Sequence, residues 1–258
     1  MLPERKVRLE RHFERINSLD DLSPSEDTNR VFSNLVEDIL NEKIQTDLMK
    51  SKKTTLRDKC GEAEYRLEKY WTKRIINSAE PKKEICKFPY YQNYLKLADF
   101  EHSTLLSCCE DPDEEAIFVG GGPLPLTAIL FAKKYGFNIT ILDRDEEAVR
   151  LCEKLLETLE IDGDVVESDA KNFDNYGDYG TVHVASMVGK TKKEELSVFR
   201  EIKSQKTRHG HIIARTVHGN RELLYRPVSK EAKSLFNVLA ESRPSKDIIN
   251  STIVMKQP

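Results

Sequence analysis

Two glutamates within a predicted helix, Glu64 and Glu68, have a spacing that suits proton transfer. They are four residues apart, so they lie on one face of the helix, and Leu67 and Trp71 lie close to that face. A carboxylate beside apolar side chains is partly desolvated, which raises its pKa toward the range that a general base needs. Alternatively, the two glutamates lie on an exposed helix face and pair with neighbouring basic residues. This is the usual arrangement of charged runs in helices.

A glycine-rich segment, GGGPLP at 120–125, follows the apolar run AIFVG. Glycines between a first strand and a first helix let the backbone approach a ligand at the carboxyl end of the strand. Pro125 occupies the place of the third glycine of dinucleotide-binding sequences, and the two prolines remove N–H donors that a pyrophosphate would need. The segment therefore favours a cofactor without a pyrophosphate, such as S-adenosylmethionine, although a plain tight turn is the alternative. The expected contacts are Gly120, Gly121, Gly122 and Pro123.

Two aspartates follow the next two predicted strands. Asp143 ends the second strand about 20 residues after the glycines, where an acidic side chain can accept both ribose hydroxyls. Asp169 follows the third strand, where the adenine would lie. Each has a plain alternative as a turn or loop residue, and Asp145 is expected only to cap a helix. Three such features at three successive strand ends favour a site for S-adenosylmethionine.

The segments before residue 112 have helical periodicity almost throughout. Apolar residues repeat at three- and four-residue spacing after SPSEDTN, which predicts a first helix there. A long second helix is expected at roughly 52–77. A further helix is expected to start at YYQNYLKLADFEHSTLL. The acidic turn EDPDEE at 110–115 suits a boundary. We therefore expect an all-helical N-terminal domain at residues 1–112.

Strands and helices alternate after residue 115. The predicted strands are AIFVG, NITILD, DVVES, TVHVASMV, HIIART and STIVMK, and the predicted helices include LPLTAILFAKKYG, ending at Gly136, and DEEAVRLCEKLLETLEI. This alternation predicts a parallel, doubly wound sheet. The fold class is thus α/β, with a Rossmann-like S-adenosylmethionine-binding domain at residues 113–258.

Composition excludes several classes of protein. The 258 residues include 41 Lys and Arg against 44 Asp and Glu, a net charge of −3, so no basic excess indicates nucleic-acid binding. Apolar runs are too short and too interrupted for a membrane span, and the charged N-terminus lacks the apolar core of a signal peptide. Five cysteines without a CxxC pair indicate neither disulfides nor a zinc site. We expect a cytoplasmic protein without a metal centre.

Six strings carry a resemblance that extends over nearly the whole chain. They are GEAEYRLE (61–68), KFPYYQNYLKL (87–97), FVGGGPLPLTAILFA (118–132), HVASMVG (183–189), RTVHGNRELLYRPV (215–228) and DIINSTIVMK (247–256). Together they resemble the nicotianamine synthases, and the plant-like members more than the archaeal ones. The resemblance implies that S-adenosylmethionine is both donor and acceptor of aminocarboxypropyl arms. Repeated transfer and closure of an azetidine ring would give the metal chelator nicotianamine, with release of 5′-methylthioadenosine and no need for a metal in catalysis.

Other functions remain open from the sequence. A relative could add one arm to a different amino acid, an ordinary methyltransferase would release S-adenosylhomocysteine, and a silent member would bind S-adenosylmethionine as a scaffold. In each case the expected partners are small molecules, with no nucleic acid and no membrane. We expect a monomer or a homodimer.

The resemblance also implies roles for particular residues. It places a catalytic glutamate in the helix at 52–77 and a catalytic tyrosine in FPYYQNY, and matching by spacing gives Glu68 and Tyr94, with Glu64 as the near alternative. An α-ammonium, with a pKa near or above roughly 8, has no lone pair until a base takes its proton. Glu68 is therefore the expected base, and Tyr94 is expected to orient the amine.

Further candidates come from residues near the ends of the fourth and fifth predicted strands. Arg215, His218, Arg221 and Tyr225 cluster from the end of HIIART onward. A cation here could bind a substrate carboxylate bidentately, with Arg215 the first choice and His218 the second. Met187 would line the cleft near the sulfonium. Alternatively, the residues after HIIART only brace the loop over the sheet. The alternative for Met187 is a place in the hydrophobic core.

Overall fold

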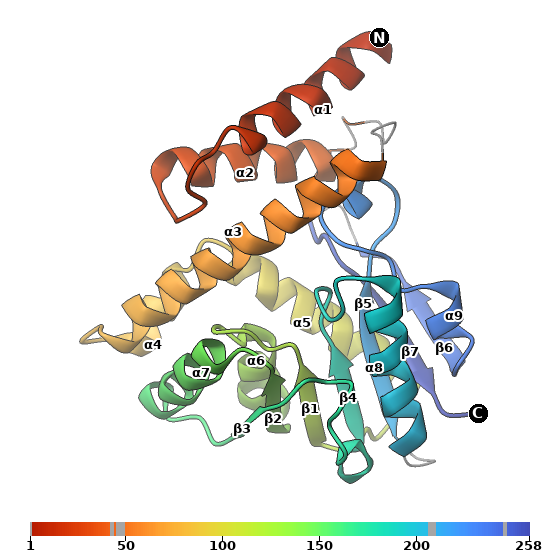
Figure 1. Cartoon of the computed structure of the whole chain (residues 1–258). Helices are drawn as coiled ribbons and strands as arrows, with labels where there is room; N and C mark the ends of the chain where they lie inside the picture. Colours follow the sequence, from red (N-terminus) through yellow and green to blue (C-terminus); the bar gives the residue numbers. More distant parts are fainter. Residues whose placement is uncertain (1, 42–43, 45–49, 206–209, 245–246) are drawn as a thin grey trace.

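The first part of the chain folds into helices in the computed structural model, which describes residues 2–41, 44, 50–205, 210–244 and 247–258. The helices here are α1 (Leu2–Asn17), α2 (Glu26–Leu40), α3 (Lys50–Ile76), α4 (Pro81–Glu84) and α5 (Tyr91–Leu106). Ser25 caps α2, since its side chain accepts from the N–H of Thr28. The predicted helices after SPSEDTN, at 52–77 and from YYQNY are therefore confirmed (Figure 1).

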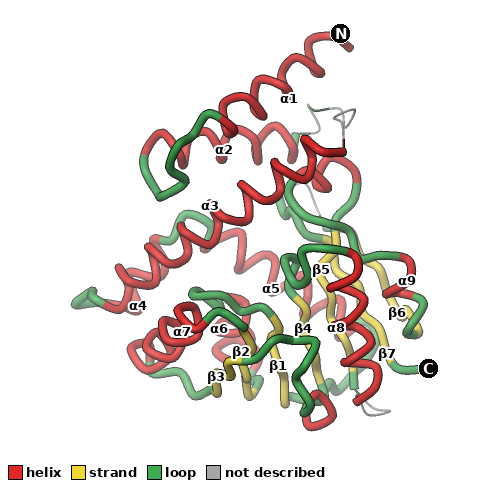
Figure 2. The backbone as a smooth tube through the Cα atoms, in the orientation of Figure 1, coloured by secondary structure: helices red, strands yellow, loops and turns green. Residues whose placement is uncertain are grey.

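Seven strands of the described chain form one sheet. They are β1 (Glu115–Val119), β2 (Asn138–Asp143), β3 (Asp164–Glu167), β4 (Thr181–Val184), β5 (His211–Thr216), β6 (Asn237–Ser242) and β7 (Ser251–Lys256). Their order is β3-β2-β1-β4-β5-β7-β6, and β1 to β5 are parallel. Figure 2 shows these strands side by side below α3. The Rossmann-like α/β fold is confirmed.

One edge of the sheet differs from the prediction. β7 is antiparallel to β5 and to β6, so the expectation of an all-parallel sheet is wrong there, and β6 was not predicted. A parallel connection needs a long crossover, usually a helix. Between β5 and β6 the chain forms η3 (Gly219–Leu223) and α9 (Lys230–Lys233), whereas only residues 243–250 connect β6 to β7. That connection is too short for such a crossover, so β7 is antiparallel to β6. The sequence of β6, NVLAES, is mostly exposed and lacks the apolar run of a buried strand.

The helices between the strands begin and end as their sequences indicate. α6 (Leu126–Tyr135) ends at Gly136, which has the left-handed φ of 78°. α7 (Glu146–Leu159) begins at Asp145, whose side chain accepts from the N–H of Ala148, so the cap expected for Asp145 is confirmed. α8 (Lys192–Gln205) follows β4.

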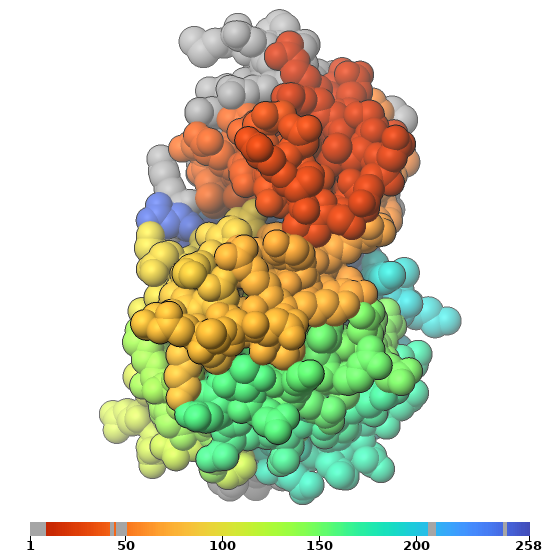
Figure 3. Space-filling model, turned by 90° about the vertical axis from the view of Figure 1, so that its left-hand side faces the viewer, coloured from red at the N-terminus to blue at the C-terminus, as the bar shows by residue number. Residues whose placement is uncertain are grey.

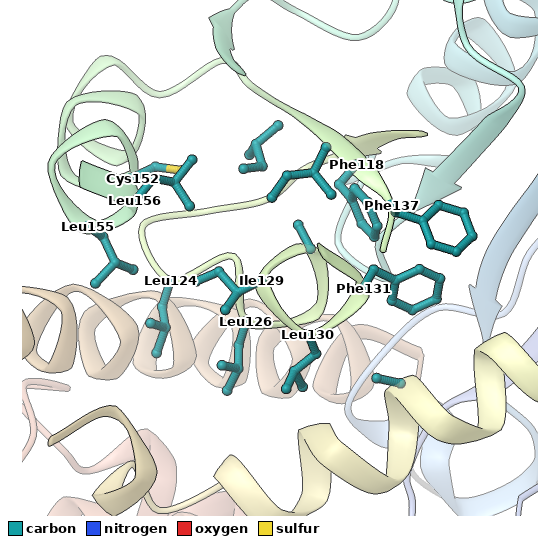
Figure 4. Close-up of a cluster of buried hydrophobic side chains, with 14 of the residues drawn as sticks. Phe118, Leu124, Leu126, Ile129, Leu130, Phe131, Phe137, Cys152, Leu155 and Leu156 are labelled. Carbon is teal, nitrogen blue, oxygen red and sulfur yellow. The ribbon is translucent and has the colours of Figure 1, made fainter. Parts of the chain in front are cut away.

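A hydrophobic cluster joins the helical part of the chain to the sheet. It contains Ile75 of α3, Leu105 of α5, Phe118 of β1 and Phe131 of α6, all at most 4% exposed. Figure 4 shows Phe118, Phe131 and Phe137 gathered at one end of this cluster, with Leu155 and Leu156 of α7 at the other end. Because the core crosses residue 112, the division into domains 1–112 and 113–258 stays a prediction.

Helix α3 lies between the helices α1 and α2 and the sheet domain, and packs against both. Its first half packs against α1 and α2 through a cluster that includes Leu9, Leu35 and Leu56. Its second half contributes Trp71 and Ile75 to the core of the sheet domain. In Figure 3 the helices α1 and α2 form the upper tier, α3 lies below them, and the sheet domain forms the base. Among the described residues, no helix is long and apolar enough to cross a membrane.

Candidate active site

The loop after β1 brings backbone next to a carboxylate of α3. Gly122 has a φ of 66°, and a Cβ there would lie 3.1 Å from Glu68 Oε2. A Cβ on Gly121 would lie 2.3 Å from Ile141 Cγ2, so no larger residue fits without movement of β2. Thr72 Oγ1 donates to the carbonyl of Pro123 at 2.8 Å, which ties the loop to α3. Gly120 has a φ of 76°, and a Cβ there would lie 2.6 Å from Val188 Cγ2. All three predicted glycines therefore have steric reasons, and the loop lies against the predicted base.

The two aspartates lie at the predicted strand ends. Asp143 Oδ2 accepts from the N–H of Gly122 at 2.8 Å, and its Oδ1 accepts from the N–H of Asp145 at 3.0 Å. Each carboxylate oxygen has a second lone pair, so Asp143 keeps acceptor capacity for a ligand hydroxyl. Asp169 is paired with Lys171, whose Nζ lies 3.1 Å from Asp169 Oδ2. The structure thus brings Asp143 to the glycine loop, while Asp169 lies in the loop after β3.

Glu68 and Tyr94 form a hydrogen bond between α3 and α5. The Tyr94 hydroxyl donates to Glu68 Oε1 at 3.3 Å, and Glu68 is 8% exposed. Burial raises the pKa of Glu68 well above its ordinary value, and the charge of Glu64 raises it further. Burial and the two glutamates also raise the pKa of Tyr94, so its hydroxyl keeps its proton. Glu68 can accept a proton, whereas Tyr94 keeps its own proton and takes part only through hydrogen bonds.

Glu64 has a phenol partner of its own. The Tyr225 hydroxyl, from the loop after β5, donates to Glu64 Oε2 at 2.8 Å. Burial raises the pKa of Glu64, although the Tyr225 hydrogen bond and the charge of Arg215 oppose the shift. The site therefore contains two carboxylate–phenol pairs, one turn of α3 apart. Because the two carboxylates repel each other in a desolvated site, ionisation of one disfavours ionisation of the other.

A buried ion pair lies beneath these two pairs. Arg215 Nε and Nη2 donate to the two oxygens of Glu101 at 2.7 and 3.0 Å, and Nη2 also donates to Thr127 Oγ1 at 2.5 Å. Glu101 is fully buried, and His183 Nε2 lies 3.1 Å from its Oε2. Burial alone would raise the pKa of Glu101, but Arg215 outweighs it with help from His183, and the pKa is lowered to about 2. The guanidinium lies 5.9 Å from the centre of the Tyr94 ring.

Two predicted substrate contacts lie apart from this cluster. His218 Nδ1 is 3.1 Å from Ser251 Oγ and its Nε2 is 2.8 Å from Glu241 Oε1, so both ring nitrogens are directed toward β6 and β7. Met187 is 46% exposed, and its sulfur lies against Gly61 of α3, 3.1 Å from where a Cβ would be. The structure thus brings together Glu64, Glu68, Tyr94 and Arg215, but not His218.

Glu101 is the residue of this cluster that the sequence analysis missed. It lies seven residues after Tyr94 in α5, on the face that also carries the buried Leu97, Ala98 and Leu105. A charged residue in the middle of an apolar helix face is a signal of a buried partner. Tyr225 was noticed in the sequence but given no role. Among the described residues, no group of three His, Cys, Asp or Glu side chains is placed to hold a metal ion.

Comparisons with known proteins identify the family. The family model described as nicotianamine synthase protein matches residues 7–258. Nicotianamine synthase 2 of Arabidopsis thaliana is 29% identical, and nicotianamine synthase 3 of the same plant is 31% identical; each match covers 95% of this chain and 81% of the relative.

Solved structures share the fold. MtNAS in complex with MTA and tNA has a TM-score of 0.86 at 23% identity, and the match covers 97% of each chain. An S-adenosylmethionine-dependent methyltransferase from Clostridium acetobutylicum has a TM-score of 0.50 at 11% identity, over 68% of this chain and 96% of the other.

The Glu101→Gln substitution tests whether the buried ion pair holds the site together. It leaves the Arg215 charge buried without a countercharge, which should lower the free energy of unfolding by about 3–5 kcal/mol at pH 7. The folded-state pKa of Glu101, about 2, lies below the ordinary 4.5, so its stabilisation is complete above pH 4.5 and is lost as the pH falls toward 2. Urea unfolding of both proteins across this range should show the difference shrinking.

The control is Glu62→Gln, on the exposed face of α3 where Glu62 pairs with Arg66 at 2.6 Å. Its effect should stay within about 0.5 kcal/mol. Equal effects of the two substitutions at pH 7 would contradict the assignment.

Proposed function

The chain belongs to the nicotianamine synthase family, and we propose that it makes nicotianamine by transferring 3-amino-3-carboxypropyl groups between S-adenosylmethionine molecules. The family match over residues 7–258 carries this proposal, because it includes the glycine loop and both members of the Glu68–Tyr94 pair. The enzyme is thus a transferase that uses S-adenosylmethionine as its substrate. MtNAS, whose fold this chain shares, has been solved with MTA and tNA bound, and a variant of it with S-adenosylmethionine bound.

S-Adenosylmethionine lies, in this proposal, at the carboxyl ends of β1, β2 and β3. The backbone of Gly120, Gly121, Gly122 and Pro123 contacts it, Asp143 accepts from the ribose, and Asp169 lies near the adenine. Asp143 supports this role because it already holds the N–H of Gly122 and has acceptor capacity left. Met187, at the end of β4 and against α3, lies on the sulfonium side.

The choice of transferred group depends on geometry at the sulfonium. Each of the three carbons bonded to sulfur could be attacked, and the one in line with the nucleophile reacts. The acceptor nitrogen forms a bond to the γ-carbon of the amino acid arm, the bond from that carbon to sulfur breaks, and its electron pair leaves with sulfur as the neutral thioether of methylthioadenosine. The proton of the acceptor ammonium goes to Glu68, which balances the step.

Glu68 suits the role of base because its environment brings its pKa closer to that of the amine. Brønsted behaviour makes a base most effective when its pKa lies near the working pH. The positive charge of the bound sulfonium favours the ionised carboxylate when substrate is present. The Tyr94 hydroxyl donates to Glu68, and its oxygen accepts an N–H of the amine and so orients it. Arg215 adds a fixed positive charge beside the Tyr94 ring.

The remaining expectations are proposals of the same kind. The helices of residues 1–112 act as a lid that excludes water from the reacting centre. His218 stays the second choice for a substrate carboxylate after Arg215, although its ring nitrogens have protein partners. The protein acts in the cytoplasm as a monomer or homodimer, on small molecules only. All five cysteines are free thiols, which supports a reducing compartment.

Incubation of the purified protein with S-adenosylmethionine alone tests the activity. Mass spectrometry should find methylthioadenosine and nicotianamine together, because the same molecule serves as donor and acceptor. S-Adenosylhomocysteine in the presence of an acceptor would mean that the methyl group faces the nucleophile. Unchanged S-adenosylmethionine, also after addition of amino acid acceptors such as histidine, would indicate a silent binding protein.

Substitution of Glu68 and Tyr94 tests the catalytic pair. Glu68→Gln should lower kcat by about 10²–10⁴-fold through loss of the base. Tyr94→Phe should lower it about tenfold, through loss of one hydrogen bond to a charged group. Both variants should bind S-adenosylmethionine by calorimetry as the wild type does, with exposed Glu62→Gln as an active control. Full activity in both would move the reaction to another site.

The coupling between the two glutamates predicts a shift in the pH profile. Because the charge of Glu64 raises the pKa of Glu68, Glu64→Gln should move the acid limb of kcat/KM to lower pH. Glutamine keeps an acceptor for the Tyr225 hydroxyl, so the fold around it is retained. The amine contributes its own limb in both proteins, and only the difference between the profiles is informative. An unshifted acid limb would show that the two carboxylates titrate independently.

A further inference from the structure

A stripe of polar side chains on α3 faces the first turn of α7. Tyr65, Lys69 and Lys73 follow one another at four-residue spacing, so they lie along one face of α3. Figure 1 shows α7 below the C-terminal half of this helix. The stripe therefore meets the sheet domain near the end of β2, where Asp143 lies.

The two lysines of the stripe hold the first turn of α7. Lys69 Nζ lies 2.5 Å from Glu147 Oε2, and Lys73 Nζ lies 3.2 Å from Glu147 Oε1. The side chain of Glu147 is 34% exposed, so this contact lies at the border with solvent. A single exposed ion pair contributes little stability, but two cations on one carboxylate form a network that fixes α7 relative to α3.

Tyr65 contacts the turn between β2 and α7. Burial, followed by the charge of Asp145 and a hydrogen bond to its carboxylate, raises the pKa of Tyr65 to about 12. The charges of Glu147 and Asp143 act in the same direction. The phenol therefore keeps its proton and donates to Asp145. Asp145 Oδ1 also accepts from the N–H of Ala148, so this carboxylate is held from α7 and from α3 at once.

The contact continues from Asp145 to the carboxylate at the end of β2. The N–H of Asp145 donates to Asp143 Oδ1 at 3.0 Å, and the N–H of Gly122 donates to Asp143 Oδ2 at 2.8 Å. Both oxygens of Asp143 are thus fixed by backbone N–H groups, one of which belongs to the residue that Tyr65 holds. A shift of the Asp145 turn would rotate the Asp143 carboxylate and move its remaining lone pairs.

We propose that Tyr65 is a positioning residue for the nucleoside part of S-adenosylmethionine: it fixes the Asp145 turn, and the turn orients Asp143 toward a ribose hydroxyl. This inference rests on the proposed function, which places the ribose at Asp143. Tyr65 acts through the turn, as a hydrogen bond behind a ligand-binding side chain fixes the direction of that side chain. The two lysines keep α3 and α7 at the separation that this contact needs.

The position of the ribose also matters for the reacting atoms. In S-adenosylmethionine the sulfonium is bonded directly to C5′ of the ribose, so a fixed ribose limits where the sulfur can lie. Tyr65 precedes Glu68 by three residues, about 4.5 Å along α3. One helix thus carries both the proposed base and the residue that orients the nucleoside, which keeps the sulfonium aligned with the base.

The test compares binding of methylthioadenosine with binding of its 2′-deoxy analogue by calorimetry, in the wild type and in Tyr65→Phe. Phenylalanine keeps the ring and removes the hydroxyl. The wild type should bind methylthioadenosine at least about tenfold more tightly, because the analogue lacks a hydrogen bond to a charged group. In Tyr65→Phe this ratio should fall to about threefold or less, whereas the affinity for the analogue should stay within about twofold. A residue that only stabilises the fold would change both affinities alike and leave the ratio unchanged.

The matched control is Tyr70→Phe, which removes a phenol hydroxyl from the same helix, at a residue that is 47% exposed. It should leave both affinities and their ratio unchanged. A wild-type ratio in Tyr65→Phe, or an equal loss of affinity for both ligands, would overturn the positioning role and leave the proposed function intact. A wild type that binds both ligands equally would also overturn it, since the ribose hydroxyl would then not be recognised. Formation of methylthioadenosine from S-adenosylmethionine decides the proposed function separately, so the two failures are distinct.

Discussion

The buried ion pair between Glu101 and Arg215 is the interaction on which the arrangement of the site depends. It joins α5 to β5 across the core, and its two hydrogen bonds fix the guanidinium in one orientation. From there the guanidinium lies beside the ring of Tyr94, which is about two turns before Glu101 on the same face of α5. Because Tyr94 in turn bonds to Glu68, the position of the proposed catalytic carboxylate follows from a charge pair that is almost completely buried. A desolvated pair of this kind contributes little net stability, but loss of either partner costs much, so it fixes the geometry.

Helix α3 gives the site its linear order. Starting from its C-terminal end, Thr72 donates a hydrogen bond to the glycine loop after β1. Glu68 and Glu64 then accept hydrogen bonds from the two tyrosine hydroxyls. Gly61 contacts the loop after β4. Arg57 then reaches the loop after β5. One helix thus contacts loops from three strands of the sheet, so a segment far from the glycines in sequence can contribute the proposed base. A rigid helix also keeps the distances between these groups constant, as repeated chemistry on a growing chain requires.

Stability and function conflict locally at this site. Two carboxylates four residues apart on a buried helix face repel each other, and burial disfavours the charge of both. The two tyrosine hydroxyls and Arg215 offset part of that cost, and the shifted pKa values that remain are what base catalysis needs. The surrounding apolar core, from Trp71 and Ile75 to Phe131, supplies the stability that tolerates it.

The sequence by itself determined most of the elements and the family. Apolar runs and helical periodicity located β1, β2, α3 and α6, because local burial patterns repeat with the period of the element. The glycine string and Asp143 indicated the cofactor end, since strand ends of a parallel sheet meet at one edge. Only the tertiary structure decided which side chains face each other. The pairing of Tyr225 with Glu64 joins residues 161 positions apart, and the Glu101–Arg215 pair joins residues 114 apart. Such contacts depend on how α3, α5 and the loop after β5 pack together, and neither spacing nor composition along the chain encodes that packing.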